Sequence, residues 1–422
     1  MKNNIFIHFA STNYSAKLRE SYLKNFIELV EKNIEVYIFY TEKELDERYI
    51  KKLKNKKINF IFYSSENDAK NKILELKDNS NIIYINTFDE NLINLTNNIK
   101  KYINQNITEN YDVFTNKYLQ RKLLLEYNSE ITVKYIEKTI EDLNFKEINN
   151  YLELPFILKP TSWIQSSWVE KINNVEEFEN YKNNYSVLLK NLQDRWYDNK
   201  TILAEEYIDW TMYSIDYFVD QNWNIKKSLP VEIILWKDIW IDDFMNISRN
   251  INKEVNNVFN NINLDTFIQD TVKALKIKNT FIHHEFKITS KNKIKTIEVN
   301  WRIWGFRLEM IDLAYNWNLF ELSEEKSKDI EKIKNNLSVL FVYPDKKWIL
   351  KDFNKELISE IKNLDSFYRI NVIENKIWKE IWLTKDWFWR VCEIVLKNVD
   401  DNKFKEDYNF IITNYKKILI LK

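Results

Sequence analysis

The sequence predicts an α/β protein of 422 residues, with a parallel sheet at its N-terminus and antiparallel sheets in its middle. Short β-rich runs alternate with helical stretches over about the first hundred residues, a pattern typical of right-handed crossovers between parallel strands. From about residue 200, strands follow one another through short polar turns. The last ninety or so residues, from about Ser338, read as short strands and turns, which predicts a small β-rich C-terminal module.

The N-terminal elements alternate regularly. Strands are predicted at residues 5–10, 35–40, 58–63 and 81–86, and helices at 17–31, 42–54, 66–76 and 90–103. The pattern is Rossmann-like, but no G-x-G-x-x-G motif follows the first strand. Because neither glycine nor tryptophan occurs before Trp163, we do not predict a dinucleotide site here.

The pattern changes around residues 108–112, where we expect a second domain to begin. A helix starting near Lys117 and a helix at 141–149 are expected, with strands at 131–136, 154–160, 280–289 and 295–301. Two further strands between residues 202 and 220 are expected to join across Asp209-Trp210. The predicted domains are 1–108, 109–330 and 331–422.

Composition excludes several classes of protein. The chain has 63 basic and 63 acidic side chains, which argues against a broad surface for nucleic acid or anionic lipid. No stretch approaches the roughly 18 apolar residues of a membrane span. The single cysteine, Cys392, excludes an intrachain disulfide and fits a reducing compartment, so we expect a cytoplasmic protein.

Glycine and tryptophan usage is the most unusual feature. The chain has one glycine, Gly305, and fifteen tryptophans, whereas a globular chain of this length would carry roughly 30 glycines. Trp210 and Trp387 each follow an aspartate and Trp223 follows an asparagine, which resembles the Asp-Gly and Asn-Gly of hairpin turns. We hypothesise that many tryptophans stand where the working protein has glycine, as a recoded stop codon read with the wrong table would produce. An AT-rich genome with genuine tryptophans is the alternative.

Two strands near residue 290 carry the sharpest functional signal. A polar turn at 290–292 separates them, so a hairpin can bring Glu285 opposite Glu298 and Asn300. Carboxylate and amide oxygens suit Mg²⁺ carried on the phosphates of a nucleotide. Arg302, on the same face as Glu298, could stabilise negative charge that develops during a transfer reaction. A solvated strand face of Glu and Lys side chains is the alternative.

The second signal is KPTSWIQSSWV, from Lys159 to Val169. With glycine at Trp163 and Trp168 it would be a flexible loop whose N–H groups could close over phosphates, beside the charge of Lys159. With two indoles the loop would be stiff and bulky. An ordinary Lys-Pro turn is the alternative.

The third signal is the segment of residues 202–216, in which Glu205 and Glu206 precede Tyr207 and Ile208. An extended segment can offer backbone donors and acceptors to an adenine edge, with a carboxylate for the ribose hydroxyls. An edge strand with surface acids is the alternative.

In this order and spacing, the three signals resemble the ATP-grasp superfamily over nearly the whole chain. Read with glycine at Trp163, Trp168, Trp210, Trp301 and Trp304, they become KPTSGIQSSGV, EEYIDGTMYSID and EVNGRIGG, similar to the family's phosphate loop, adenine hinge and metal-binding strand. The resemblance implies a preATP-grasp domain, a two-subdomain core that clamps ATP, and a C-terminal module. The N-x-R-x-G-G run and the tail at 377–391 look most like the L-amino-acid ligase branch.

The resemblance also implies roles for individual residues. Lys117 and Lys159 match lysines that contact ATP phosphates, and Arg302 matches an arginine that stabilises the acyl-phosphate and tetrahedral species. The implied loop residues are Trp163, Ser166, Ser167, Trp168 and Val169. The implied hinge residues are Glu205, Glu206, Tyr207 and Ile208. The implied ligands of Mg²⁺ or Mn²⁺ are Glu285, Glu298 and Asn300.

The implied function is an ATP-dependent ligase that activates a small carboxylic acid as an acyl phosphate and transfers it to an amine. The expected partners are therefore small molecules, with no nucleic acid or membrane, and a homodimer is one option for the assembly. A biotin-carboxylase-like or carbamoyl-phosphate-synthase-like enzyme and a catalytically silent ATP-binding protein are the alternatives. We expect core or surface roles for His8, His283 and His284, since His284 faces away from Glu285.

Overall fold

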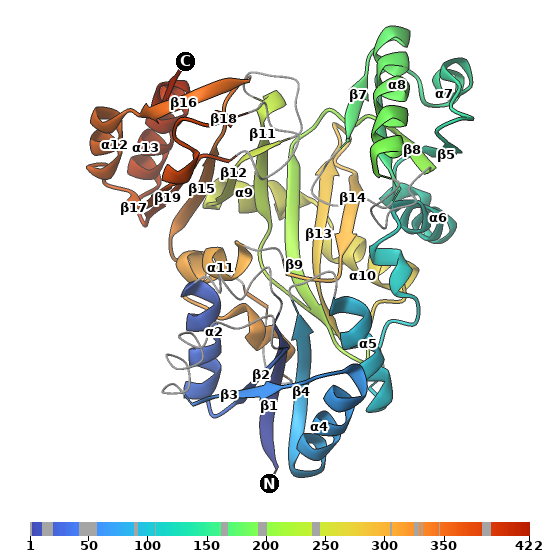
Figure 1. Ribbon diagram of the computed structural model, residues 1–422, viewed down its shortest axis with the longest axis vertical. Coiled ribbons are helices and arrows are strands. Elements are labelled where there is room, and N and C mark those ends of the chain that lie inside the picture. Colours follow the sequence, from blue (N-terminus) through green and yellow to red (C-terminus); the bar gives the residue numbers. More distant parts are fainter. Residues whose placement is uncertain are drawn as a thin grey trace.

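The computed structural model of the chain is shown in Figure 1. The residues that it describes are 2–10, 20–41, 57–87, 92–105, 107–161, 168–192, 201–238, 245–303, 306–324, 329–330, 332–345, 347–381 and 390–422, without the side chains of 20–22 and 187–192. The helix expected at 42–54 lies outside these residues. Within them, no helix is long and apolar enough to cross a membrane.

A four-stranded parallel sheet forms the N-terminal end of the molecule, as predicted (Figure 1). Alternate residues of its central strand enter different cores, since Phe6 packs with Phe26 whereas Ile7 packs with Ile73 and Ile99. Burial on both faces explains why the strands read as continuous apolar runs. The elements are β1 (Asn3–Phe9), α2 (Glu20–Glu31), β2 (Glu35–Tyr40), β3 (Ile58–Phe62), α4 (Glu66–Asn79), β4 (Ser80–Thr87) and α5 (Ile93–Tyr102), in the strand order β3-β2-β1-β4.

A small antiparallel sheet of order β5-β8-β6-β7 follows. The helix expected at 141–149 begins later, at Phe145, because the Asn144 side chain caps it by accepting the Glu147 N–H. The strand expected at 131–136 likewise begins at Tyr135. The elements are α6 (Lys117–Tyr127), β5 (Tyr135–Thr139), α7 (Phe145–Leu152), β6 (Phe156–Pro160), β7 (Glu170–Ile172), α8 (Val175–Leu192) and β8 (Thr201–Glu206).

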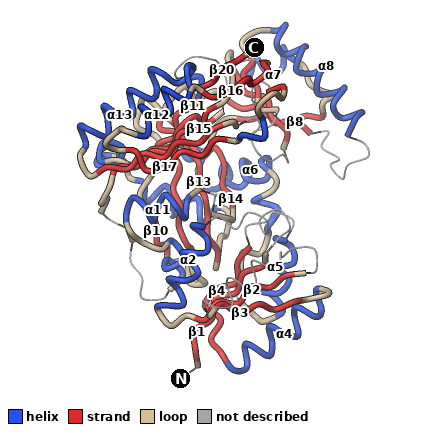
Figure 2. Tube along the Cα trace, turned by 60° about the vertical axis from the view of Figure 1, so that its left-hand side comes forward, coloured by secondary structure: helices blue, strands red, loops and turns tan. Residues whose placement is uncertain are grey.

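A nine-stranded sheet forms the body of the molecule, above the N-terminal sheet in Figure 2. Its order is β14-β13-β9-β11-β12-β15-β19-β17, with β10 paired to β9. The strands are β9 (Met212–Val219), β10 (Ile225–Lys227), β11 (Val231–Leu235), β12 (Asn246–Ile251), β13 (Thr280–Ile288), β14 (Ile294–Asn300), β15 (Asn336–Val342), β17 (Phe367–Val372) and β19 (Cys392–Asn398). The helices are α9 (Lys253–Val258), α10 (Leu264–Ala274), α11 (Arg307–Tyr315), α12 (Lys355–Lys362) and α13 (Asp401–Asn414).

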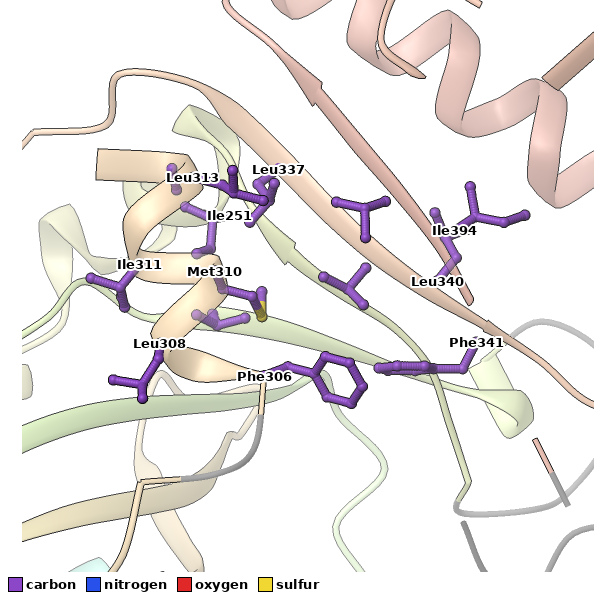
Figure 3. Close-up of a cluster of buried hydrophobic side chains, with 14 of the residues drawn as sticks. Ile251, Phe306, Leu308, Met310, Ile311, Leu313, Leu337, Leu340, Phe341 and Ile394 are labelled. Carbon is purple, nitrogen blue, oxygen red and sulfur yellow. The ribbon is translucent and has the colours of Figure 1, made fainter. Parts of the chain in front are cut away.

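The C-terminal strands continue this sheet. β15 pairs with β12, so the sheet crosses the domain boundary expected at residue 330. Figure 3 shows the packing beside this continuity: the ring of Phe306, just before α11, faces that of Phe341 on β15 (centroids 5.1 Å), and Met310 of α11 and Leu340 of β15 belong to the same buried cluster. A separate three-stranded sheet is made of β16 (Trp348–Phe353), β18 (Glu380–Ile381) and β20 (Leu419–Leu421).

Residues 207–211 connect two different sheets. β8 pairs with β5 and β6, whereas β9 pairs with β11 and β13. The interpretation of Asp209-Trp210 as a hairpin turn is therefore wrong. Alternating patterns locate strands but do not identify their partners, because pairing depends on residues far apart in sequence. We call residues 207–211 the crossover.

Among the tryptophans that the structure describes, three have a left-handed backbone. The φ angles are 61° for Trp168, 66° for Trp223 and 61° for Trp378. A side chain in this region costs roughly 1–2 kcal/mol, which glycine avoids. The glycine hypothesis thus gains a conformational reason at these positions. It gains none at Trp210 and Trp301, which do not have positive φ, and it stays a prediction.

Candidate active site

The predicted hairpin exists and brings two carboxylates together. β13 and β14 are antiparallel, with Glu285 paired to Glu298 and His283 paired to Asn300. Asn292 takes the left-handed conformation (φ 56°) that closes the turn, which asparagine tolerates. Arg302 lies two residues beyond the end of β14 and is partly buried. The two expected carboxylate ligands are therefore cross-strand neighbours.

Helix α6 supplies the cation beside Glu298. The Gln120 side chain donates to the Val299 carbonyl (2.8 Å) and accepts from its N–H (3.1 Å), which docks α6 on β14. Lys117, one turn earlier on the same face, places its Nζ 2.8 Å from Glu298 Oε1. Burial acts to raise the pKa of Glu298, but the Lys117 ammonium outweighs it and the pKa is lowered.

A second buried carboxylate lies between two cations. Glu205 is 2.7 Å from Arg121 Nε and 2.7 Å from Lys159 Nζ, and all three side chains are buried. Burial lowers the pKa of Lys159 to about 8, although Glu205 acts in the opposite direction. Lys159, predicted as a phosphate ligand, thus lies at the end of β6 already paired with Glu205. The Glu205 carboxylate is paired with both cations in this structure, and its expected role at the hinge stays a prediction.

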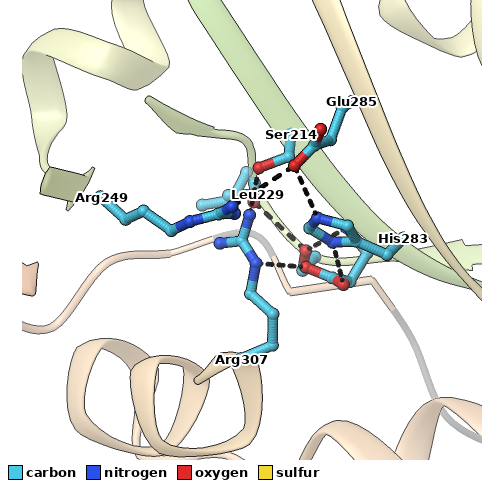
Figure 4. A network of polar contacts seen from close by, with 8 residues as sticks. Ser214, Leu229, Arg249, His283, Glu285 and Arg307 are labelled. Carbon is cyan, nitrogen blue, oxygen red and sulfur yellow. Dashed lines mark hydrogen bonds and ion pairs between the residues drawn. The ribbon is translucent and has the colours of Figure 1, made fainter. Parts of the chain in front are cut away.

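Glu285 belongs to a polar network shown in Figure 4. Its Oε1 is 3.3 Å from Arg249 Nη2 and 3.4 Å from His283 Nε2, and His283 Nδ1 is 2.9 Å from Asp216 Oδ1. Arg307 forms an ion pair with Asp216 (2.9 Å). Burial acts to raise the pKa of Glu285, but His283 and Arg249 lower it to about 2.

Four members of this network could not be recognised from the sequence. Asp216 is on β9, Arg249 on β12, His283 on β13 and Arg307 on α11, so only the tertiary fold brings them together. The one available signal was the alternation of the strand, which puts His283 on the face of Glu285. The prediction for the neighbouring His284 holds, since it is buried and stacks on Phe267.

The expected adenine hinge leads from β8 into the crossover. The Glu206 carboxylate accepts the Lys134 N–H (3.0 Å). The Tyr207 hydroxyl donates to Asp209 (2.7 Å), which also pairs with Lys237 (2.9 Å). The crossover therefore has side-chain anchors on both sides of Ile208, whose carbonyl accepts from Lys287 Nζ (2.7 Å).

The expected phosphate loop is only partly described. Trp163, Ser166 and Ser167 lie outside the described residues. Trp168 packs its ring on Tyr185, and its carbonyl accepts from the Tyr181 hydroxyl (3.2 Å). Val169, the next residue, is partly buried.

The donor set fits Mg²⁺ bound to a nucleotide better than a free-standing metal centre. No group of three or more His, Cys, Asp or Glu side chains within the described ranges is arranged to hold a metal ion. Mg²⁺ is commonly held by one or two carboxylates together with substrate phosphates and water. Glu285 and Glu298, with the amide of Asn300 nearby, match that requirement.

Comparisons with known proteins identify a domain and a fold. Residues 152–308 match the sequence model of the ATP-grasp domain. No curated protein sequence matches the chain. The chain has the fold of the L-amino acid ligase from Bacillus licheniformis (TM-score 0.64, 14% identity, covering 100% of this chain and 99% of that chain).

Two further solved structures have the same fold. One is the phosphoribosylglycinamide synthetase from Anaerococcus prevotii (TM-score 0.60, 16% identity, 100% and 99% coverage). The other is the biotin carboxylase domain of the Hydrogenobacter thermophilus 2-oxoglutarate carboxylase, in complex with MgADP and bicarbonate (0.59, 12%, 100% and 91%). Residues 152–308 therefore match an ATP-grasp domain, as the motifs indicated, and the chain as a whole shares the fold of these structures. Its similarity to the L-amino acid ligase shows a shared fold.

Proposed function

We propose that the chain is a Mg²⁺- and ATP-dependent carboxylate–amine ligase that joins an amino acid or a small carboxylic acid to an amine. The observation that supports this most strongly is the cross-strand pair Glu285–Glu298, in which each carboxylate is held by a basic side chain. Glu285, Glu298 and Asn300 would hold Mg²⁺, which neutralises charge on the phosphates. The likeness to an L-amino acid ligase favours the amide-forming branch.

The proposed reaction has two steps. A carboxylate oxygen of the acid attacks the γ-phosphorus of ATP and ADP leaves, which gives an acyl phosphate. The amine nitrogen then attacks the acyl carbon, phosphate leaves and the nitrogen loses a proton, which gives the amide. Such transfers depend mainly on positioning and charge neutralisation and need no covalent nucleophile on the protein. Cys392 fits this account, since burial raises the pKa of its thiol to about 12.

The basic side chains would change partners when the nucleotide binds. Lys117 and Lys159 are now paired with Glu298 and Glu205. A phosphate group would attract both ammonium groups, and the departure of Lys117 would leave Glu298 able to bind a cation. Arg302, two residues beyond the end of β14, would stabilise the negative charge of the acyl phosphate and of the tetrahedral species. The base would lie along the backbone of Glu206–Ile208.

Release of ADP and phosphate tests this function. The purified protein is incubated with Mg²⁺, ATP, the standard amino acids and hydroxylamine or a second amino acid as the amine. We expect ADP and a hydroxamate or dipeptide only when acid and amine are both present. ADP release that depends on bicarbonate instead would favour the carboxylase alternative. ATP binding without turnover across the panel would favour a silent ATP-binding protein.

Matched variants distinguish an effect on the candidate site from an effect on folding. Glu298→Gln should abolish turnover, whereas Glu232→Gln on β11, whose carboxylate accepts from Asn250 (3.1 Å), should retain it. The assay includes a form with glycine at Trp163 and Trp168. If the glycine hypothesis is correct, this form turns over faster, because its phosphate loop can approach the nucleotide.

A further inference from the structure

Lys287 is a buried lysine that reaches the crossover from the large sheet. It lies on β13, two residues after Glu285, and is 5% exposed. Its Nζ donates to the Ile208 carbonyl at 2.7 Å. Burial of an ammonium group is costly unless the group is paired with an opposite charge or hydrogen-bonded. Lys287 thus occupies a backbone acceptor within the segment proposed to bind the base.

The other groups around this contact keep the crossover in place. Lys287 Nζ is 5.6 Å from the centre of the Tyr207 ring, and Lys237 and Lys171 lie over the same ring at 5.8 Å and 4.9 Å. Lys237 also pairs with Asp209, the partner of the Tyr207 hydroxyl. The occupied carbonyl therefore belongs to a segment that several side-chain contacts hold in place.

The hydrogen bond from Lys287 to the Ile208 carbonyl affects which group a purine can carry at its 2-position. The N–H and C=O of one residue point toward the same edge of an extended backbone. A purine whose N1 accepts the Ile208 N–H would present its 2-position to the Ile208 carbonyl. Adenine has only a hydrogen there, whereas guanine and 2,6-diaminopurine have an amino group that needs an acceptor. With Lys287 on that carbonyl, the amino group would face another donor.

We propose that Lys287 makes the nucleotide site reject 2-aminopurines and is a specificity-determining residue for the base. The proposal rests on the proposed function, because it assumes that the crossover binds the base of ATP. A buried polar group left without a partner is the strongest source of discrimination between similar ligands. Removing the lysine side chain would free the Ile208 carbonyl to accept from the amino group.

The test compares ATP with 2-amino-ATP, which differs only by the amino group at position 2. Calorimetry with Mg²⁺ gives both dissociation constants for the wild type, Lys287→Met and Lys295→Met. Lys295 is the matched control, because it pairs with Lys287 across the hairpin and its Nζ also donates to a backbone carbonyl, that of Thr132 (2.7 Å).

We expect the wild type and Lys295→Met to bind ATP about tenfold or more tightly than 2-amino-ATP, the ratio that corresponds to about 1.4 kcal/mol. Lys287→Met should lose this preference or reverse it, which a merely structural role would not produce. Equal binding of both nucleotides by the wild type would overturn the proposal without any variant. So would a preference for ATP that persists in Lys287→Met. A wild type that binds neither nucleotide would instead count against the proposed function.

Discussion

Lys117 Nζ lies 2.8 Å from Glu298 Oε1, so a lysine predicted to bind phosphate neutralises a carboxylate predicted to bind Mg²⁺. Glu285, on the other strand of the hairpin, is likewise paired with a basic side chain, since Arg249 Nη2 of β12 lies 3.3 Å from Glu285 Oε1. Each carboxylate is thus balanced by a basic side chain in the structure without nucleotide. Binding of Mg²⁺ and ATP would replace the cation on each carboxylate and give the lysine a phosphate partner.

Removal of the Lys117 charge should weaken binding of Mg·ATP by about tenfold or more, because a charge-assisted contact to phosphate is lost. Lys117→Met is compared with Lys138→Met, whose ammonium pairs with Glu147 at the surface (2.8 Å). The readout is the dissociation constant from calorimetry. Equal affinities in the two variants would exclude Lys117 from phosphate binding. Chelation of Mg²⁺ should weaken ATP binding by the wild type.

Affinity for ATP should fall as pH rises through about 8. Burial lowers the pKa of Lys159 to about 8 from 10.5, so the folded protein loses this charge at a lower pH than the unfolded chain does. Lys159→Arg keeps its charge over this range and should show a flatter pH profile of the ATP dissociation constant. An unchanged slope in Lys159→Arg would assign the dependence to another group.

The lowered pKa of Lys159 should also affect folding stability: stability should increase with pH, whereas affinity for ATP should fall. Between about pH 8 and 10.5 the unfolded chain holds the Lys159 proton that the folded protein has lost, so stability increases with pH over this window. Denaturant unfolding of the wild type relative to Lys159→Met should show this increase. A stability difference that does not vary with pH would contradict the lowered pKa.

The sequence predicted those parts of the site that depend on local pattern. Glu285 and Glu298 were found because alternation and a polar turn predict a hairpin, but a register shift between Glu285 and Phe286, which the pattern did not indicate, places Glu298 opposite Glu285. The partners of these residues could not be found in this way. Arg249 and Asp216 lie on strands that reach the hairpin only through the order of the large sheet, which no local pattern encodes.

The same limit explains the errors in the fold. The N-terminal sheet was predicted because its strands alternate with helices, a pattern that indicates a parallel sheet. The crossover was mistaken for a hairpin because β8 and β9 are close in sequence but belong to different sheets. Likewise nothing local signals that β15 pairs with β12, while the expected division into domains stays a prediction.

His283 should be a positioning residue for Glu285. His283→Ala should weaken Mg²⁺ binding in the presence of ATP by about 10–100-fold, the usual effect of losing a residue that orients a metal ligand. His283→Gln, which can still donate to Glu285, should restore part of the affinity. His284→Ala is the control: it removes a buried ring that stacks on Phe267, so it should lower stability and leave the Mg²⁺ affinity unchanged. Equal Mg²⁺ affinities in all variants would refute this role.

Trp378 offers the clearest test of the glycine hypothesis in the fold. Its side chain is 64% exposed and its φ is 61°. Trp378→Gly should be more stable than Trp378→Ala by about 1 kcal/mol, because only glycine relieves the left-handed strain. By contrast, Trp236→Gly should lose about 3–5 kcal/mol, because Trp236 is only 1% exposed and fills the core. Denaturant unfolding measures both differences.

The native protein gives an independent answer. If Trp168, Trp223 and Trp378 are glycine in the cell, peptides of the natural protein that span these positions contain glycine in mass spectrometry. Peptides with tryptophan at all three positions would refute the hypothesis there.

Transfer of oxygen from the acid to phosphate tests the central claim most directly. The acid that supports ADP release is labelled with ¹⁸O in its carboxylate, and the phosphate formed together with the amide is analysed by mass spectrometry. An acyl phosphate intermediate requires one labelled oxygen in each phosphate, because the bridging oxygen comes from the acid. Phosphate without the label would contradict the proposed ligase mechanism.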